Sequence, residues 1–171
     1  METRFKFLGH PVHPMLIVFP LGLLSTAVVF DALYLITDNR DFAVFSFWAI
    51  AAGVVGGLAA ALFGLIDWLA IPSGTRAKQV GLIHGGGNVV IVALFAVSWL
   101  MRLDGVAFGP NLLPFVLGLA GALLALVTAW LGGELVYRLR VAVDDDAHLD
   151  ASNSLSRSGV AEVIDAPRHQ P

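Results

Sequence analysis

Residues 42–66 read FAVFSFWAIAAGVVGGLAAALFGLI, an unbroken run without a charged side chain. A helix needs about 20 mainly apolar residues to cross the hydrocarbon core of a bilayer. The run is too long for a buried strand and lacks the alternation of apolar and polar residues that a half-buried strand shows. It therefore predicts a membrane-spanning helix, which we place at residues 42–71.

Three further segments share this character, at residues 15–36, 82–101 and 112–137. The connections between them are short, which places consecutive helices side by side and antiparallel. Helices satisfy their own backbone hydrogen bonds in lipid, whereas a closed barrel would need more strands. The expected fold is an all-α membrane protein, a four-transmembrane-helix antiparallel bundle formed by residues 1–143.

The composition agrees with a chain whose solvent is lipid. Apolar residues make up 57% of the chain and charged residues 13%, about half the charged share of a soluble domain. The absence of cysteine excludes disulfides and thiolate metal sites. No basic stripe indicates nucleic acid, so the lipid bilayer is the expected partner.

Residues 144–171 are polar and aperiodic, which predicts a disordered cytoplasmic tail.

Basic side chains are distributed unevenly between the two sets of helix ends. Two, Arg40 and Arg102, lie at one set. Six lie at the set shared by both termini: Arg4, Lys6, Arg76, Lys78, Arg138 and Arg140. Cytoplasmic loops carry the excess of Lys and Arg in membrane proteins. The asymmetry therefore predicts that both termini are cytoplasmic.

Ionisable residues in or beside the spans are few, and they gather at this same side. Such residues are costly in a membrane and usually serve a function. Asp31 lies near the opposite end, whereas alternating helix direction brings together His10, His13, Asp67, His84 and Glu134. The stretch of chain from His13 to Asp67 is nearly as long as the stretch from His84 to Glu134. This spacing suggests a repeated two-helix hairpin.

Histidine is the commonest metal ligand, and a ligating histidine usually donates its other N–H to a carboxylate or carbonyl. His13 and His84 are therefore candidate ligands of a haem or a transition metal. Asp67 and Glu134 are expected to orient them, and His10 is a spare ligand or proton carrier. The same residue types also suit proton relay or quinone binding without a metal.

Small residues are abundant within the spans, and they allow helix backbones to approach closely. Gly85, Gly86 and Gly87 serve such packing or leave clearance for a flat cofactor. No P-loop, GxSxG or HExxH motif is present, so catalytic residues cannot be assigned and enzymatic activity stays open.

Four strings resemble an uncharacterised bacterial membrane family, labelled domain of unknown function 2231, over residues 7–143. They are GHPVHPMLIVFPLGLL (9–24), GLIDWLAIP (64–72), HGGGN (84–88) and GGELVYR (132–138). The resemblance implies a compact four-helix domain in a bacterial inner (cytoplasmic) membrane, with no settled activity. Members are sometimes joined to redox modules or encoded near them. Members often continue GGELVYR with histidine and glycine, where this chain has Leu139 and Arg140.

The resemblance favours electron transfer through a bound haem or metal, with a redox partner protein. Two alternatives of other classes remain. The chain is a non-catalytic membrane scaffold or partner subunit, in which the small-residue faces bind another helix or a second copy. Alternatively, it is a small proton or solute transporter, for which four spans would need to assemble as a homo-oligomer.

Overall fold

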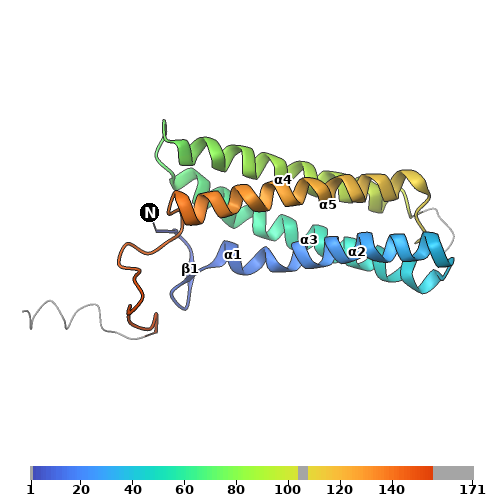
Figure 1. Cartoon of the computed structure of the whole chain (residues 1–171), viewed down its shortest axis with the longest axis horizontal. Coiled ribbons are helices and arrows are strands. Elements are labelled where there is room, and N and C mark those ends of the chain that lie inside the picture. Colours follow the sequence, from blue (N-terminus) through green and yellow to red (C-terminus); the bar gives the residue numbers. More distant parts are fainter. Residues whose placement is uncertain (1, 104–107, 156–171) are drawn as a thin grey trace, which may run out of the picture.

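The computed structural model describes residues 2–103 and 108–155, in which four long helical rods run alternately in opposite directions (Figure 1). The rods are α1 (Val12–Leu16) with α2 (Val18–Thr37), α3 (Arg40–Ala70), α4 (Arg76–Leu100), and α5 (Leu112–Gly133) with the π-helical turn η2 (Glu134–Arg138). Each of the four rods is long and apolar enough to cross a membrane. The predicted all-α membrane fold is confirmed.

The first rod is interrupted at Ile17, and Pro20 explains the break. Proline has no backbone N–H, so it cannot donate to the carbonyl of Leu16 four residues earlier. The rod nevertheless continues, because Ile17 N donates to His13 O at 3.2 Å and Leu21 N donates to Ile17 O at 3.1 Å. His13 is thus held on a short first helix that is continuous with the span.

Side-chain caps set where two of the helices begin. Asn39 accepts a hydrogen bond from Asp41 N at 3.0 Å and starts α3 after a left-handed residue, Asp38. Thr75 accepts from Lys78 N at 3.2 Å and starts α4 at Arg76. The third long rod therefore begins well before the predicted position 82, because its first turns are polar and an apolar run does not reveal them.

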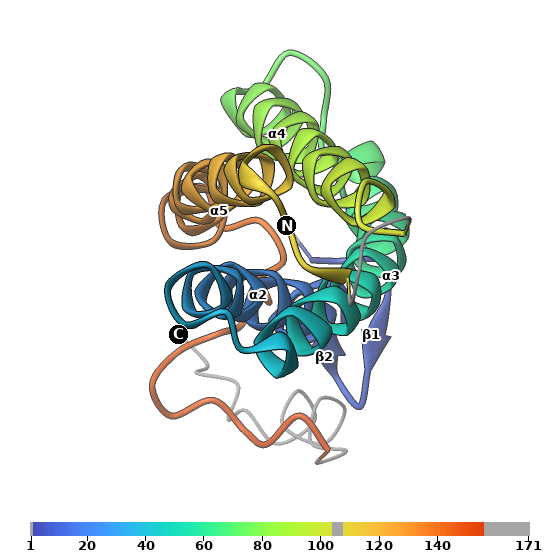
Figure 2. The same ribbon diagram turned by 90° about the vertical axis from the view of Figure 1, so that its right-hand side faces the viewer.

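The four rods form a ring when viewed end-on (Figure 2). Sequential helices pack as two hairpins, α2 with α3 and α4 with α5, and contacts of α3 with α4 and of α2 with α5 close the ring. Helices α2 and α4 therefore lie on one diagonal. The core between the rods is formed by Leu24, Ala27, Ile50, Ile91 and Phe95.

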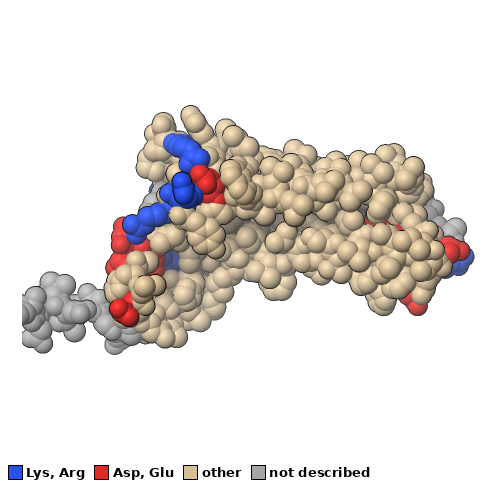
Figure 3. Space-filling model, viewed as in Figure 1, with Lys and Arg blue, Asp and Glu red and all other residues tan. Residues whose placement is uncertain are grey.

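Charged side chains lie at the two ends of the molecule on the face drawn in Figure 3, with an uncharged band between them. The band coincides with the apolar helix middles, whose large side chains, such as Val29, Val55 and Leu126, face outward. An exposed apolar belt of this kind suits a lipid environment. The two charged ends then lie at the two membrane surfaces.

The N-terminal segment folds into a small hairpin that the sequence pattern did not predict. Strands β1 (Lys6–Phe7) and β2 (His10–Pro11) pair antiparallel, with Phe7 opposite His10. The turn residues Leu8 and Gly9 both have positive φ, 51° and 84°. Positive φ at both central positions is the requirement of the tight hairpin turn whose twist matches its strands.

Part of the predicted tail, residues 144–155, runs back along this hairpin (Figure 1). Lys6 Nζ contacts Asp144 Oδ1, and His10 Nε2 lies 3.3 Å from Ser154 Oγ. Hydrogen bonds to Asp144 and to Glu2 raise the pKa of Lys6 above its ordinary value. Residues 156–171, which carry the rest of the predicted tail, lie outside the described residues.

Candidate functional site

Two histidines occupy matched positions at one end of the bundle. His13 comes from α1 and His84 from α4, on the diagonal of the ring. The Nδ1 atom of His13 lies 2.9 Å from the carbonyl oxygen of Ala60 on α3. The Nδ1 atom of His84 lies 2.8 Å from the carbonyl oxygen of Thr128 on α5. Each imidazole is therefore fixed by the main chain of the other helix in its own hairpin.

These contacts define the neutral tautomer of both rings. A carbonyl oxygen only accepts hydrogen bonds, so Nδ1 must carry the proton and donate it. Nε2 then holds a lone pair in the neutral ring. For His84 this assignment has a second support, because Nδ2 of Asn88, which can only donate, lies 3.2 Å from Nε2. The lone pair of both rings is thus on Nε2, and in His84 it accepts the hydrogen bond from Asn88.

Glycine makes room for each ring. A Cβ atom at Gly64 would lie 2.8 Å from Cε1 of His13, and one at Gly132 would lie 3.3 Å from Cε1 of His84. Each glycine lies about one helical turn after the residue whose carbonyl holds the ring. A carbonyl acceptor and a glycine one turn later, Ala60 with Gly64 and Thr128 with Gly132, thus hold the imidazole in the same way in both hairpins.

The two histidine positions belong to a repeat that extends through the bundle. His13 and His84 are separated along the chain by the same interval as Leu24 and Phe95 in the core. Leu24 packs against Gly53 of its own hairpin, and Phe95 packs against Gly121 in the same way. Positions 53 and 121 are in turn separated by the same interval as positions 60 and 128, whose carbonyls hold the rings. The two hairpins are therefore equivalent in packing, as the predicted two-helix repeat requires.

The polar surroundings of the two rings differ. Asn88 Nδ2 also donates to the carbonyl of His84 at 2.9 Å, and Thr128 Oγ1 donates to Asn88 Oδ1 at 3.2 Å. At the corresponding repeat positions the first hairpin has Ile17 and Ala60, which offer no polar side chain. His84 therefore has polar side chains around its ring, and the matching positions around His13 are apolar.

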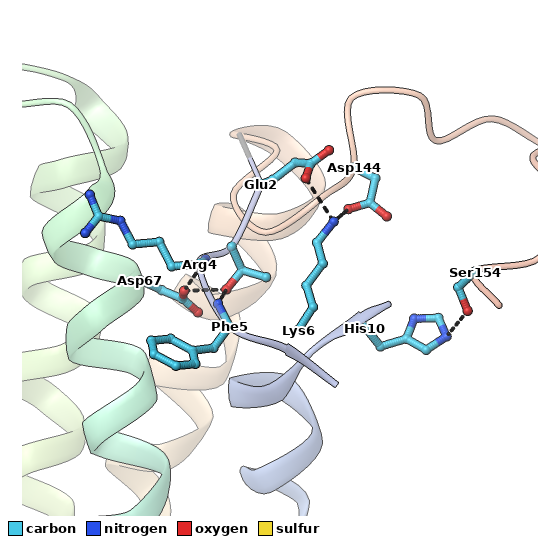
Figure 4. A network of polar contacts seen from close by, with 9 residues as sticks. Glu2, Arg4, Phe5, Lys6, His10, Asp67, Asp144 and Ser154 are labelled. Atoms are coloured by element: carbon cyan, nitrogen blue, oxygen red, sulfur yellow. Dashed lines mark hydrogen bonds and ion pairs between the residues drawn. The ribbon is translucent and has the colours of Figure 1, made fainter. Parts of the chain in front are cut away.

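Asp67 is directed to the N-terminal segment and not to a histidine. Its carboxylate is buried and accepts hydrogen bonds from Thr3 Oγ1 and from Arg4 N, the latter at 3.3 Å (Figure 4). Phe5 adds an edge-on contact to Phe63 on the same helix, with ring centroids 5.8 Å apart. Asp67 thus fastens the N-terminal segment to the end of α3.

His10 and Glu134 also have partners other than the two rings. The His10 side chain points outward to Ser154 (Figure 4). Glu134 pairs with Arg76 on α4, with Oε1 and Nη2 2.6 Å apart. The expectation that Asp67 and Glu134 orient the histidines is corrected, because main-chain carbonyls take that role. Every residue has a main-chain carbonyl, so the sequence could not show that carbonyls of the neighbouring helices bind the imidazoles.

Of the three glycines after His84, one serves packing. A Cβ at Gly87 would lie 2.6 Å from Cγ2 of Thr128, whereas Gly85 and Gly86 are exposed and have no atom within 4 Å of such a Cβ. The surface of α4 beside His84 is therefore unfilled.

The opposite end of the bundle holds a buried ion pair. Asp31 and Arg102 are both fully buried and form two parallel contacts of 2.7 Å. Arg102 also donates from Nη1 to Ser46 Oγ, from Nη2 to Ser98 Oγ and from Nε to Ser98 O, at 3.1, 2.9 and 3.2 Å. All five N–H groups of the guanidinium are thus satisfied.

Asp31 stands out in the sequence as a charge within a span, whereas Arg102 follows the apolar run and resembles a loop residue. The interval between Asp31 and Arg102 along the chain equals the interval between the two histidines. This equal spacing could have indicated in the sequence that Asp31 and Arg102 form a pair. Ser98 Oγ in turn donates to Pro114 O at 2.7 Å. All four spans are therefore joined at one cation, and we call Asp31, Arg102, Ser46 and Ser98 the buried clamp.

Among residues 2–103 and 108–155, no three His, Asp or Glu side chains come together as ligands for a metal ion. The site therefore offers two imidazole nitrogens and no carboxylate. Any bound metal would need most of its ligands from another source.

The helices, the apolar belt and the polar site at one end define a multi-pass α-helical membrane protein. A family model described as "Predicted membrane protein (DUF2231)" matches residues 9–145. The chain belongs to this family, as the sequence resemblance predicted. The comparisons with curated proteins and with solved structures returned no match.

Proposed function

We propose that this domain binds a haem between His13 and His84 and transfers electrons in the membrane. The observation that carries the proposal is the matched presentation of the two imidazoles. Each donates from Nδ1 to a main-chain carbonyl, at 2.9 Å for His13 and 2.8 Å for His84, which leaves the lone pair on Nε2. A second hydrogen bond of this kind is the usual support of a metal-ligating histidine, because it fixes the tautomer and makes the ligating nitrogen more basic.

The number of ligands favours haem over a bare ion. A structural zinc site takes four ligands, which this end of the bundle does not offer within the described residues. A porphyrin supplies four nitrogens itself, so two histidines complete the coordination. Sites between facing helices are also the usual place for cofactors in helical bundles. Bound haem iron would supply reversible one-electron chemistry.

The residues around the rings have distinct roles in this proposal. Gly64 and Gly132 leave room for the imidazoles beside α3 and α5. Asn88 donates to the lone pair of His84 that would bind iron, so its amide must turn away when that nitrogen ligates. Its second bond, to the carbonyl of His84, can persist and keep the side chain beside the ring.

Orientation and cellular context follow from the distribution of basic residues. Six of them lie at the end that carries the histidines, and the opposite end carries Arg40 and the buried Arg102. We propose a bacterial inner membrane location with both termini cytoplasmic, which places the haem near the cytoplasmic surface. A soluble or membrane redox partner would then meet the protein at that end.

The test is the cofactor content of protein purified from membranes. Haem per protein is measured by absorption of its pyridine complex, and iron, copper and zinc by elemental analysis. His13→Ala and His84→Ala are expected to lose the haem. His10→Ala and His148→Ala, which remove exposed histidines, are the matched controls and should retain it. Wild-type protein that carries neither haem nor a stoichiometric metal would contradict the proposal.

A further inference from the structure

The N-terminal hairpin exposes an apolar tip outside the spans. Phe7 is 59% exposed and Leu8 60%, and Phe5 is 47% exposed beside them. The basic residues Arg4 and Lys6 alternate with the two phenylalanines. Successive residues of a strand point to opposite faces, so Phe7 and Lys6 of β1 point to opposite sides. Lys6 turns the other way, toward Glu2 and Asp144 (Figure 4).

The choice of Leu8 at the turn is unusual. Its φ of 51° lies in the left-handed region, which asparagine and glycine adopt at lower cost and which two-residue hairpin turns usually assign to them. The Leu8 side chain lies outside the buried core and is mostly exposed, whereas the next turn residue, Gly9, lies against Ser154 of the C-terminal segment. A strained residue that exposes an apolar side chain points to a role at that surface.

The position of the hairpin beside the first span indicates that its tip contacts lipid. It projects sideways from the end of the bundle, past α1 and across the direction of the helices (Figures 1 and 2). The outward side chains of the first rod, among them Met15, Val18 and Phe19, are exposed directly after the hairpin. The apolar tip thus lies at the end of the molecule where the exposed apolar surface of the first span begins.

We propose that the β1–β2 hairpin is an interfacial lipid anchor, with Phe7 and Leu8 in the boundary between headgroups and acyl chains. Segments that lie in this boundary bury phenylalanine and leucine side chains there, because burial removes their apolar surface from water. Arg4 is exposed beside the hairpin, and basic residues near a membrane surface are attracted to anionic headgroups. The anchor is independent of any cofactor bound by the histidines.

The absence of cysteine makes the depth of the hairpin measurable at single positions. The full chain carrying Leu8→Cys is labelled with a nitroxide and placed in nanodiscs of phosphatidylcholine and phosphatidylglycerol. Collision of the label with oxygen, which prefers lipid, is compared with collision with a water-soluble nickel complex. Val29→Cys, on the exposed face of α2, marks the lipid interior, and Leu149→Cys, fully exposed beyond the spans, marks water.

The proposal predicts a label at Leu8 that collides with nickel several-fold less than one at Leu149 and lies shallower than one at Val29. A label at Phe7→Cys, on the same hairpin, should give the same depth. Agreement between the two labels would show that the depth is not caused by one substitution. A label at Leu8 as accessible to nickel as that at Leu149 would place the hairpin in water and overturn the proposal. A label shielded from both reagents would mean that protein covers the tip, which overturns it as well.

Discussion

The buried clamp allows the sharpest test of how the two hairpins hold together. Asp31 and Arg102 are fully buried and make two parallel contacts of 2.7 Å. Removing one partner of a buried pair leaves a charge without compensation and costs about 3–5 kcal/mol. Asp31→Asn and Arg102→Met are each expected to destabilise the bundle by about that amount, a large share of the roughly 5–15 kcal/mol typical of a domain.

The double variant should cost no more than either single one. With both charges gone, no ion is stranded in the core, and a buried pair replaced by neutral side chains is often tolerated. Ser98 keeps its hydrogen bond to Pro114 O at 2.7 Å, so its hydroxyl is not orphaned. The double-mutant cycle therefore predicts an interaction energy of about 3 kcal/mol or more between the two positions.

The assay is reversible unfolding of the purified protein in mixed micelles, followed by far-ultraviolet circular dichroism. All four proteins of the cycle are measured in the same detergent. Single-variant losses that simply add in the double variant would refute the reasoning, because additivity means that the two charges do not stabilise one another. Losses below about 1 kcal/mol would show that the pair is solvated, since exposed ion pairs contribute that little.

Three further predictions concern close approaches and the N-terminal segment. Gly64→Ala should lower the haem retained after purification, because its Cβ would lie 2.8 Å from Cε1 of His13; pyridine haemochrome absorption measures the loss. Gly53→Ala should cost about 1–3 kcal/mol by overpacking, with a leucine carbon 2.5 Å from the new Cβ, whereas Gly22→Ala, with no atom within 4 Å, should be close to neutral in the same unfolding assay. Thr3→Val removes a hydrogen bond to a buried carboxylate, a loss of about 1–3 kcal/mol, and should speed hydrogen exchange of residues 2–11 while exchange in the spans stays unchanged.

The four helices could be predicted because lipid imposes a simple rule. Each span must present about 20 apolar residues in one run, and the boundaries were found to within a few residues except at the start of α4. There the polar turn from Arg76 is helical because Thr75 caps it. The small hairpin escaped prediction, since two-residue strands leave no periodicity and Leu8-Gly9 is not a common turn pair.

The sequence predicted where the two histidines of the candidate site lie, but it did not predict which groups hydrogen-bond to them. His13 and His84 lie at one end, as the direction of the helices required, but Asp67 binds Thr3 and Glu134 binds Arg76. Main-chain carbonyls fix the imidazoles, and every residue has a carbonyl, so composition cannot reveal which one is used. The partner of Asp31 was missed for a different reason, because Arg102 follows the apolar run and resembles a loop residue in the sequence.

The central claim is that His13 and His84 bind one haem through Nε2, and the absorption spectrum of the ferric and ferrous protein tests it most directly. The wild-type protein is expected to give a six-coordinate, low-spin spectrum typical of two imidazole ligands. Either His13→Gly or His84→Gly should lose that spectrum and recover it in part when imidazole is added. Protein without a Soret band after purification from haem-supplemented cells, or a spectrum unchanged in both variants, would contradict the claim.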